Sequence, residues 1–479
     1  MKKNYLIAIA VAALMLATTV AQAADITFSG QFRPRFNVEN DANETTPGRS
    51  YFDTRIRLNA ATNVNANTSV FLQFQSVGTW GNAGLSTDLD NNTDRGSEIG
   101  SDVLNDVGFH QAFITLKSLF GKAVNAKIGR QEVVLDGHRL FGHTGWTTGA
   151  QTNDAIRLDH AAGNHTLSYV YVASSEGGVL NTAADSNLNF HVVRANTQGI
   201  LGGNLTGMFV IADDSSTNAT SSDEEVWYTV GARQSGKLGG LDYRVEYYHQ
   251  FGDGGVSAAT SDHAGAYGTT PTATVNSHID RDASMFGIRV GKTFKNARLS
   301  PTITLWYDNL SGTDDSDVSG NDNGTFHTLQ DTGHKFYGLI DNFTSAIGDG
   351  TQRMGLQDIA IKTKFKVSDV NTLKIDWHQF LTQTDLEDSD SDTIRTNAGG
   401  AFTAARSGTG VLSNDLGQEV DVTLVHKYDS NTKFVVGYSH YFATLTHSWL
   451  NGSGGTGPDN TNNENDGQDW FYVMADTKF

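Results

Sequence analysis

Apolar and polar side chains alternate with a period of two along most of the chain. Between Ile26 and Phe36 the apolar residues occupy nearly every second position, and Arg33 and Arg35 stand between them. Successive side chains of a β-strand point to opposite faces, so each such stretch predicts a strand with one apolar and one polar face. No helical periodicity competes with this pattern, and we expect an all-β protein.

Eighteen stretches of this kind predict strands that begin near residues 25, 51, 68, 107, 122, 152, 165, 188, 204, 225, 241, 282, 297, 356, 371, 417, 432 and 470. The expected connections alternate between long and short, at 12, 5, 26, 4, 15, 4, 15, 6, 12, 6, 30, 3, 45, 4, 34, 3 and 26 residues. Outer-membrane barrels have short periplasmic turns and longer extracellular loops, whereas a soluble sandwich has no reason to gather its long connections at one end. The sequence therefore predicts a transmembrane antiparallel β-barrel of 18 strands.

A barrel also explains the composition, in which only 38% of the residues are hydrophobic. Every backbone group in hydrocarbon needs a partner within the protein, and a closed sheet provides one without an apolar interior. Eighteen strands enclose more space than side chains fill, so we expect an aqueous channel.

Residues 1–23 do not follow the strand pattern. Lys2 and Lys3 precede a short apolar run, and Ala21 and Ala23 form a small-residue cleavage site before Ala24. These features predict a cleaved signal peptide rather than a membrane anchor, because the apolar run is too short to span a bilayer. We expect residues 24–479 to form a single barrel domain in the bacterial outer membrane.

The end of the chain resembles the C-terminal assembly signal of outer-membrane proteins. Phe471, Val473, Ala475, Thr477 and Phe479 share one face of the last expected strand. Thr477 is less aromatic than the usual pattern. We expect the barrel-assembly machinery to recognise Phe471 and Phe479.

Charge is distributed unevenly between the expected strands and connections. Without the leader the chain has 32 basic and 53 acidic residues, of which 22 basic and 16 acidic residues fall within the expected strands. The connections thus hold 10 basic and 37 acidic residues. Rings of basic side chains favour anions in pores, so the wall is expected to attract anions unless neighbouring carboxylates neutralise it.

The basic residues expected to face the lumen alternate with apolar ones. They are Arg33, Arg35, Arg55, Arg57, Lys127, Arg157, Arg233, Arg244, Arg289, Lys362, Lys364 and Lys366.

Two regions resemble the alginate-export porin family. The first runs from Gly129 and Arg130 through Arg139 and Trp146 to the strand at 154–158. The second comprises 334–341, the strands that begin at Leu356 and Asn371, and 417–421. The resemblance covers nearly the whole chain after the leader.

This resemblance implies an eighteen-stranded barrel, and the exporter that names the family passes an anionic polysaccharide through an arginine-lined lumen. It also implies that Arg130, Arg139 and Arg157 are lumen residues near the constriction, and that 334–341 belongs to an external loop. The family is broad, so the substrate stays open.

No catalytic or cofactor site is expected. The chain has no Cys, which excludes thiolate metal sites and thiol nucleophiles. His138 with His143, and His160 with His165, lack the spacing of a zinc site and are interpreted as surface residues.

Asp314, Asp315 and Asp317 offer oxygen ligands for Ca²⁺, but they lack the other positions of an EF-hand loop, so plain solvation is the favoured interpretation. No basic, aromatic-rich patch indicates nucleic acid.

The sequence favours a porin-like channel over an enzyme. Two hypotheses concern its cargo, which is either small anionic solutes or an acidic polysaccharide. The alternative is a barrel that sheathes an electron-transfer or enzymatic partner, which would have to supply any haem-ligating cysteines. The other expected partners are outer-membrane lipid and lipopolysaccharide.

Overall fold

The structure is a computed structural model, which describes residues 25–40, 48–80, 107–175, 188–214, 225–256, 278–313, 317, 322–343, 351, 354–384, 413–444, 446–447 and 467–479. The expected leader at 1–23, Asp314 and Asp315 lie outside these ranges.

In these described ranges, nineteen strands form one sheet. They are β1 (Ile26–Asn40), β2 (Arg49–Asn63), β3 (Thr68–Thr79), β4 (Gly108–Leu116), β5 (Val124–Gln131), β6 (Asn153–Ala162), β7 (His165–Ser175), β8 (Leu188–Ile200), β9 (Gly203–Asp214), β10 (Glu225–Leu238), β11 (Leu241–Val256), β12 (His278–Thr293), β13 (Thr302–Leu310), β14 (Asp322–Asn323), β15 (Leu356–Lys366), β16 (Asn371–Leu381), β17 (Asp415–Lys427), β18 (Thr432–Ala443) and β19 (Gln468–Lys478).

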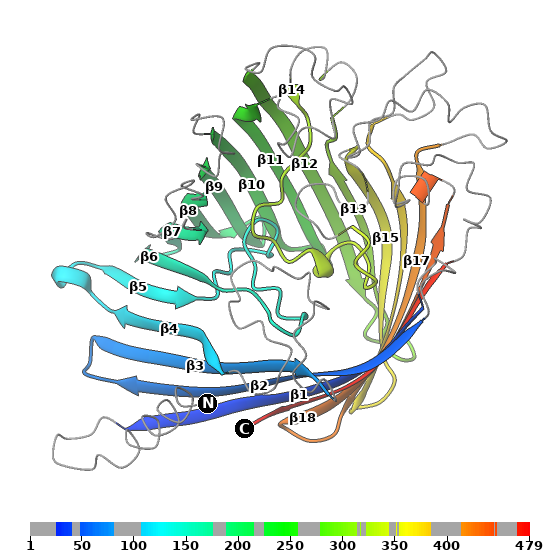
Figure 1. Cartoon of the computed structure of the whole chain (residues 1–479), viewed down its shortest axis with the longest axis horizontal. Coiled ribbons are helices and arrows are strands. Elements are labelled where there is room, and N and C mark those ends of the chain that lie inside the picture. Colours follow the sequence, from blue (N-terminus) through cyan, green and yellow to red (C-terminus); the bar gives the residue numbers. More distant parts are fainter. Residues whose placement is uncertain are drawn as a thin grey trace, which may run out of the picture.

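Eighteen of these strands make a closed antiparallel barrel, which confirms the fold predicted from the sequence (Figure 1). Each wall strand pairs with its neighbours in chain order, β13 pairs with β15, and β19 pairs with β1. The two-residue β14 is not part of the wall and pairs in parallel with β12. Two short 3-10 turns, η1 (Leu119–Gly121) and η2 (Gly333–Lys335), are the only helical elements with bounds in the described part. None of the described helices has the length and apolar character needed to span a bilayer.

The connections alternate between the two ends of the barrel. The short ones are 64–67, 117–123, 163–164, 201–202, 239–240, 294–301, 367–370 and 428–431. In the turn between β10 and β11, Gly239 and Gly240 have φ values of 59° and 80°. Both central residues of this two-residue hairpin need positive φ, which glycine adopts without steric cost. The short-turn end is the periplasmic end of such a barrel.

The backbone of Phe479 closes the barrel against β1. The Gly30 N–H donates to the Phe479 carbonyl at 2.7 Å, and the Phe479 N–H donates to the Gly30 carbonyl at 3.1 Å. A Cβ on Gly30 would stand 2.5 Å from Cζ of the Phe479 ring, so the ring occupies space that only glycine leaves open. Phe471 shares the outward face with Phe479, as the sequence predicts.

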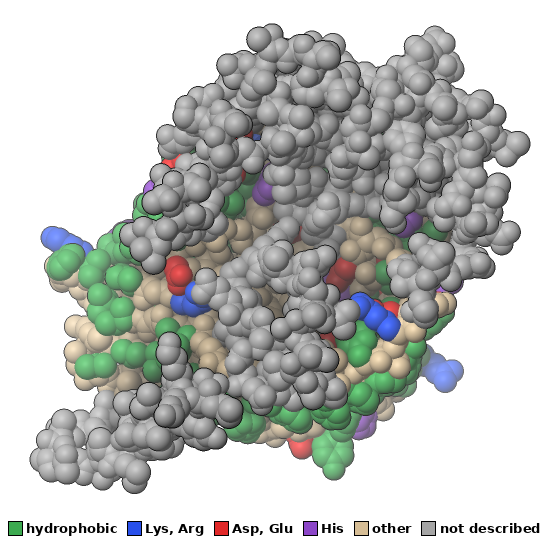
Figure 2. All heavy atoms as spheres, in the orientation of Figure 1, with side chains coloured by type: hydrophobic (Ala, Val, Ile, Leu, Met, Phe, Trp, Pro, Cys, Tyr) green, Lys and Arg blue, Asp and Glu red, His purple; other side chains and the backbone are tan. Residues whose placement is uncertain are grey.

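The two faces of the wall differ as the alternation requires. Exposed apolar side chains such as Ile56, Leu58 and Leu305 face outward, and Figure 2 shows hydrophobic side chains along the outer margin of the described wall. Arg33 and Arg55 face inward and are 5% and 3% exposed, which is unusual for arginine. Something inside the barrel must therefore cover them.

Two inner segments cover the inward-facing residues. The first inner segment is 132–152, between β5 and β6, and the second is 322–343, between β13 and β15. Figure 1 shows both inside the ring of strands, in cyan and yellow-green. The Gly142 N–H donates to the Gln330 carbonyl at 2.7 Å, so the two segments are joined to each other.

Candidate substrate path

Two arginines of the wall bind the backbone of the first inner segment. Arg33 on β1 donates from Nη1 to the Gly145 carbonyl at 2.8 Å and from Nη2 to the carbonyls of Trp146 and Thr147 at 2.9 Å each. Arg55 on β2 donates from Nη1 to Gly145 and Thr147 at 3.2 and 3.1 Å. A buried carbonyl without a partner costs free energy, and these guanidinium groups provide the donors that the irregular segment lacks.

The junction of the two inner segments contains a stacked aromatic pair. The rings of Trp146 and His334 lie 4.8 Å apart at an angle of 5°. Arg35 lies 5.1 Å from the Trp146 ring centroid and binds Asp53 at 2.7 Å. His334 in turn contacts Asp341 at 2.6 Å, between Nδ1 and Oδ1. The 334–341 stretch, expected in an external loop, does lie in the long connection between β13 and β15, but it folds into the barrel.

Buried carboxylates of the wall bind the inner segments from the other side. Arg139 of the first segment binds Glu246 on β11 and Asp308 on β13, and its Nη1 donates to the Tyr337 hydroxyl at 2.5 Å. All of these side chains are almost fully buried. Arg139 is thus inside the barrel, as the resemblance implies, but it is a structural connection and not an exposed lumen residue.

The second inner segment has an equivalent anchor in Glu419 on β17. Its Oε1 accepts hydrogen bonds from the backbone N–H groups of Leu339 and Ile340, at 2.5 and 3.0 Å. Glu419 and the two arginines of β1 and β2 therefore hold the two segments at different parts of the wall.

Three further predicted arginines on the inner face, on β10, β11 and β12, also have carboxylate partners. Arg233 and Arg244 lie 3.6 and 3.2 Å from Glu246, and Arg289 lies 3.7 Å from Asp308.

Arg57 and Arg157 have carboxylate partners too. Arg57 lies 3.3 Å from Glu132, and Arg157 binds Asp159 at 2.8 Å. The expected excess of wall arginines is therefore largely neutralised in place.

Arg130 does not face the lumen, contrary to what the resemblance implies. The β5–β6 register places Arg130 opposite Asp154, and Ile128 opposite Ile156. Both isoleucines are exposed on the outer face, and residues two apart on a strand share a face. Arg130 and Asp154, which lie 3.5 Å apart, thus belong to the outward surface.

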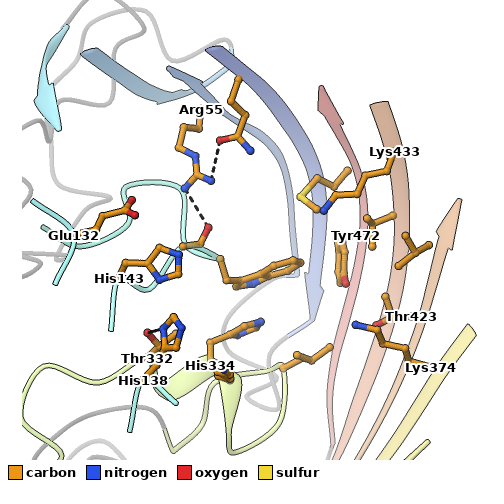
Figure 3. A pocket seen from close by; sticks show the side chains of 18 of the residues that line it. Arg55, Glu132, His138, His143, Thr332, His334, Lys374, Thr423, Lys433 and Tyr472 are labelled. Carbon is orange, nitrogen blue, oxygen red and sulfur yellow. Dashed lines mark hydrogen bonds between the residues drawn. The ribbon is translucent and has the colours of Figure 1, made fainter. Parts of the chain in front are cut away.

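A cavity of about 910 Å³ lies inside the barrel beneath the inner segments (Figure 3). Its lining includes eight basic residues and two acidic ones. The basic residues are Arg55, Arg57, Arg289, Lys335, Lys362, Lys374, Lys433 and Lys478, the acidic ones are Glu132 and Asp376, and three histidines, His138, His143 and His334, complete the charged or titratable lining.

In Figure 3, Glu132, His138 and His143 come from the first inner segment, whereas Lys374 and Lys433 project from strands on the other side of the view. Four of the predicted lumen residues line this cavity, namely Arg55, Arg57, Arg289 and Lys362. Arg33, Arg35, Arg139, Arg157, Arg233, Arg244 and Lys364 are not in its lining.

Sequence reasoning did not single out four lysines of the lining. Lys374, Lys433 and Lys478 belong to strands, and the period-two alternation could have placed each of them on the inner face. Lys335 could not have been found in this way, because it belongs to an inner segment without periodicity.

Burial and nearby charges shift the pKa values of titratable groups in the first inner segment. Burial alone would raise the pKa of Glu132, but the hydrogen bond to His110 and the charge of Arg57 lower it to about 2. Burial lowers the pKa of His138 to about 4, and the charge of Lys335 adds to this effect. Burial also lowers the pKa of His143. The cavity therefore has an ionised carboxylate and neutral histidines on this side at neutral pH.

The interpretation of His138 and His143 as surface residues is wrong, since both line the cavity. His160 is exposed, and His165 also lies in an exposed environment, as expected. Among the described residues no group of three or more His, Asp or Glu side chains could hold a metal ion. Asp317 is described, but its two companions in the expected Ca²⁺ tract are not.

Comparison with known proteins agrees with this architecture. The sequence profile for alginate export matches residues 24–444. This chain belongs to the alginate export family. A search of curated proteins found no match.

Solved structures share the fold at low sequence identity. OccK8 (OprE) of Pseudomonas aeruginosa is 12% identical, with a TM-score of 0.54 over 95% of this chain and 98% of that chain. OccAB4 of Acinetobacter baumannii is 11% identical, with a TM-score of 0.55 over 96% and 99%. OccK2 (OpdF) of P. aeruginosa, solved in complex with glucuronate, is 12% identical, with a TM-score of 0.50 over 95% and 96%. The family member described here is an outer-membrane barrel channel.

Proposed function

We propose that this family member conducts small anionic solutes across the outer membrane. The observation that supports this proposal is the internal cavity, with eight basic and two acidic residues in its lining. An ion that crosses the barrel must pass fixed charges at contact distance, where mobile ions screen them least.

Carboxylated sugars are the solutes that we favour. The lining of the cavity includes the partly buried rings of Trp146 and Trp306 together with its basic side chains. A sugar carboxylate can pair with an ammonium or guanidinium group while its apolar face lies against an aromatic ring. The glucuronate complex of OccK2 (OpdF) supports the chemistry, since that barrel has the same fold.

Because the chain belongs to the alginate export family, export of an acidic polysaccharide is a second candidate function. A polymer would have to pass the junction of the two inner segments, where Trp146 and His334 stack. The two inner segments occupy the barrel interior, and this argues against a barrel that sheathes a protein partner. We propose no catalytic role.

Reversal potentials across planar bilayers test the proposal. With a gradient of potassium chloride we expect anion preference, and the preference should weaken as salt reduces the Debye length from about 10 Å at 0.1 M to about 3 Å at 1 M. Glucuronate added to one side should reduce the chloride current, whereas glucose should not. Cation preference at low salt would contradict the proposal. Block by long acidic oligosaccharides but not by glucuronate would favour the polysaccharide hypothesis.

A further inference from the structure

Among the described residues, five pairs of Lys or Arg side chains lie directly opposite one another on adjacent strands of the barrel. They are Arg33 with Arg55, Lys127 with Arg157, Arg244 with Arg289, Lys364 with Lys374, and Lys427 with Lys433. Like charges directly opposite each other destabilise a sheet unless something neutralises them. The neighbours of each pair therefore show whether groups within the protein neutralise its charge or whether a bound solute could do so.

The arginine pairs have partners within the chain. Arg33 and Arg55 share the carbonyls of the first inner segment, as described above. Arg244 and Arg289 lie beside buried carboxylates, at 3.2 and 3.7 Å.

Two of the remaining pairs have a carboxylate beside one member. Arg157 binds Asp159 at 2.8 Å, and Lys433 lies 3.2 Å from Asp476. In four of the five pairs, an internal acceptor offsets the repulsion.

Within the part of the chain that the structure describes, Lys364 and Lys374 have no such acceptor. No carboxylate of the described residues lies within 4.0 Å of either amine. The neighbouring Lys362 does have a carboxylate, Asp376, at 3.9 Å. Ile361 and Ile375 are exposed on the outer face, so the alternation places both lysines of the pair on the inner face. Lys374 lines the cavity, and Lys364 lies opposite it toward the short-turn end.

We propose that Lys364 and Lys374 form a binding site for the oxyanion group of a permeating solute, on the inner face of the wall beside the short turn 367–370. This inference rests on the proposed function and names the residues that give the channel its charge preference. The solute's carboxylate or phosphate group supplies the negative charge that the described residues do not place beside this pair. Lys335 also lines the cavity and has no described carboxylate within 4.0 Å.

The difference between arginine and lysine supports this assignment. A guanidinium group holds two acceptors in a fixed plane and suits permanent connections, whereas an ammonium group on a flexible stem is a hydrated point charge. Conduction needs sites that bind an ion well enough to admit it and weakly enough to release it. Arg33, Arg55 and Arg139 stabilise the first inner segment, whereas Lys364 and Lys374 remain available to the solute.

Charge removal at the pair tests the inference. In K364Q/K374Q, the ratio of chloride to potassium permeability in 0.1 M salt should fall about five-fold or more, because one unit charge about 4 Å from an ion is worth about 1 kcal/mol in water. K122Q/K295Q is the matched control, since it removes the same charge from exposed residues of two short turns. K364R/K374R keeps both charges, so its ratio of chloride to potassium permeability should equal that of the wild type, while a bound anion should be released more slowly.

A binding measurement adds a readout that charge selectivity alone does not give. Inorganic phosphate and glucuronate should each raise the thermal unfolding temperature of the purified wild-type barrel, and glucose should not. The increase should disappear in K364Q/K374Q and persist in K122Q/K295Q. An effect of phosphate alone, or of glucuronate alone, identifies which oxyanion the pair accepts.

The outcomes separate this inference from the proposed function. Cation preference in the wild type would contradict the proposed function and this inference together. Anion preference that K364Q/K374Q leaves unchanged would overturn only the inference, and the lining arginines would then determine selectivity. An equal fall in K122Q/K295Q would also overturn it, because the effect would come from net charge and not from the pair.

Discussion

Arg33 donates a hydrogen bond of 2.9 Å to the backbone carbonyl of Trp146, although 113 positions separate the two residues along the chain. This contact joins β1 to the segment that narrows the barrel. The narrow part of the channel thus depends on the first strand of the wall.

Arg33→Met should loosen the first inner segment. The substitution removes the donors to three carbonyls, and each hydrogen bond to a charged group contributes about 1.5–3 kcal/mol. We expect lower stability against denaturant and a larger, noisier single-channel conductance. Arg130→Met, on the outer face, is the control and should change neither quantity. Quiet currents of wild-type size in Arg33→Met would show that other contacts hold the segment.

Arg139→Met should be the most destabilising of the arginine substitutions. It leaves Glu246 and Asp308 in the interior without their nearest counter-charge, and removal of one partner of a buried ion pair costs about 3–5 kcal/mol. The midpoint of unfolding in guanidinium chloride, measured in detergent micelles, gives the change in stability. Arg157→Met loses a more exposed pair with Asp159, for which about 1 kcal/mol or less is expected. Equal losses in the two variants would contradict the structural role of Arg139.

Acid should loosen the first inner segment in two overlapping steps. Burial and nearby charge lower the pKa of His138 from 6.5 to about 4, so its contribution to stability is present above pH 6.5 and is lost as the pH falls toward 4. The pKa of Glu132 is lowered from 4.5 to about 2, so its contribution is present above pH 4.5 and is lost as the pH falls toward 2.

Stability curves against pH can separate the two groups. His138→Gln should reduce the loss of stability between pH 6.5 and about 4 and leave the loss between pH 4.5 and about 2 unchanged. Glu132→Gln should have the opposite effect. His160→Gln, at an exposed position, is the control. If His138→Gln left the loss of stability between pH 6.5 and about 4 unchanged, another group would be responsible for it.

Deletion of Phe479 should reduce the amount of closed barrel. It removes the pair of backbone hydrogen bonds with Gly30 and the ring that lies over that glycine. Phe479→Ala keeps the backbone bonds and therefore isolates the effect of the ring. The heat-modifiable fraction on gels of outer-membrane extracts measures insertion, and an unchanged fraction in both variants would mean that Phe479 is dispensable for closure.

The wall was predictable because its pattern is local. Each strand shows its own alternation, and turn residues such as Gly239 and Gly240 mark the hairpin ends. The same alternation could have corrected the misplaced Arg130. Lys127 was expected on the inner face, and a residue three positions later on a strand lies on the other face.

The inner segments were not predictable in this way. The partners of Arg139 are 107 and 169 positions away, and no periodicity connects them. The charge count over the strands indicated an excess of basic residues, but it could not show which of them Glu246, Asp308 or a backbone carbonyl would neutralise. That information requires the three-dimensional arrangement.

The separation of the wall from the inner segments matters for how such channels diversify. Outward positions must satisfy the lipid bilayer whatever the cargo, whereas 132–152 and 322–343 lie inside the barrel and bind its inner face. Insertions or substitutions in these two segments can therefore give a new cargo preference without a new barrel. Grafting the corresponding segments between family members is a practical route to channels with altered permeability.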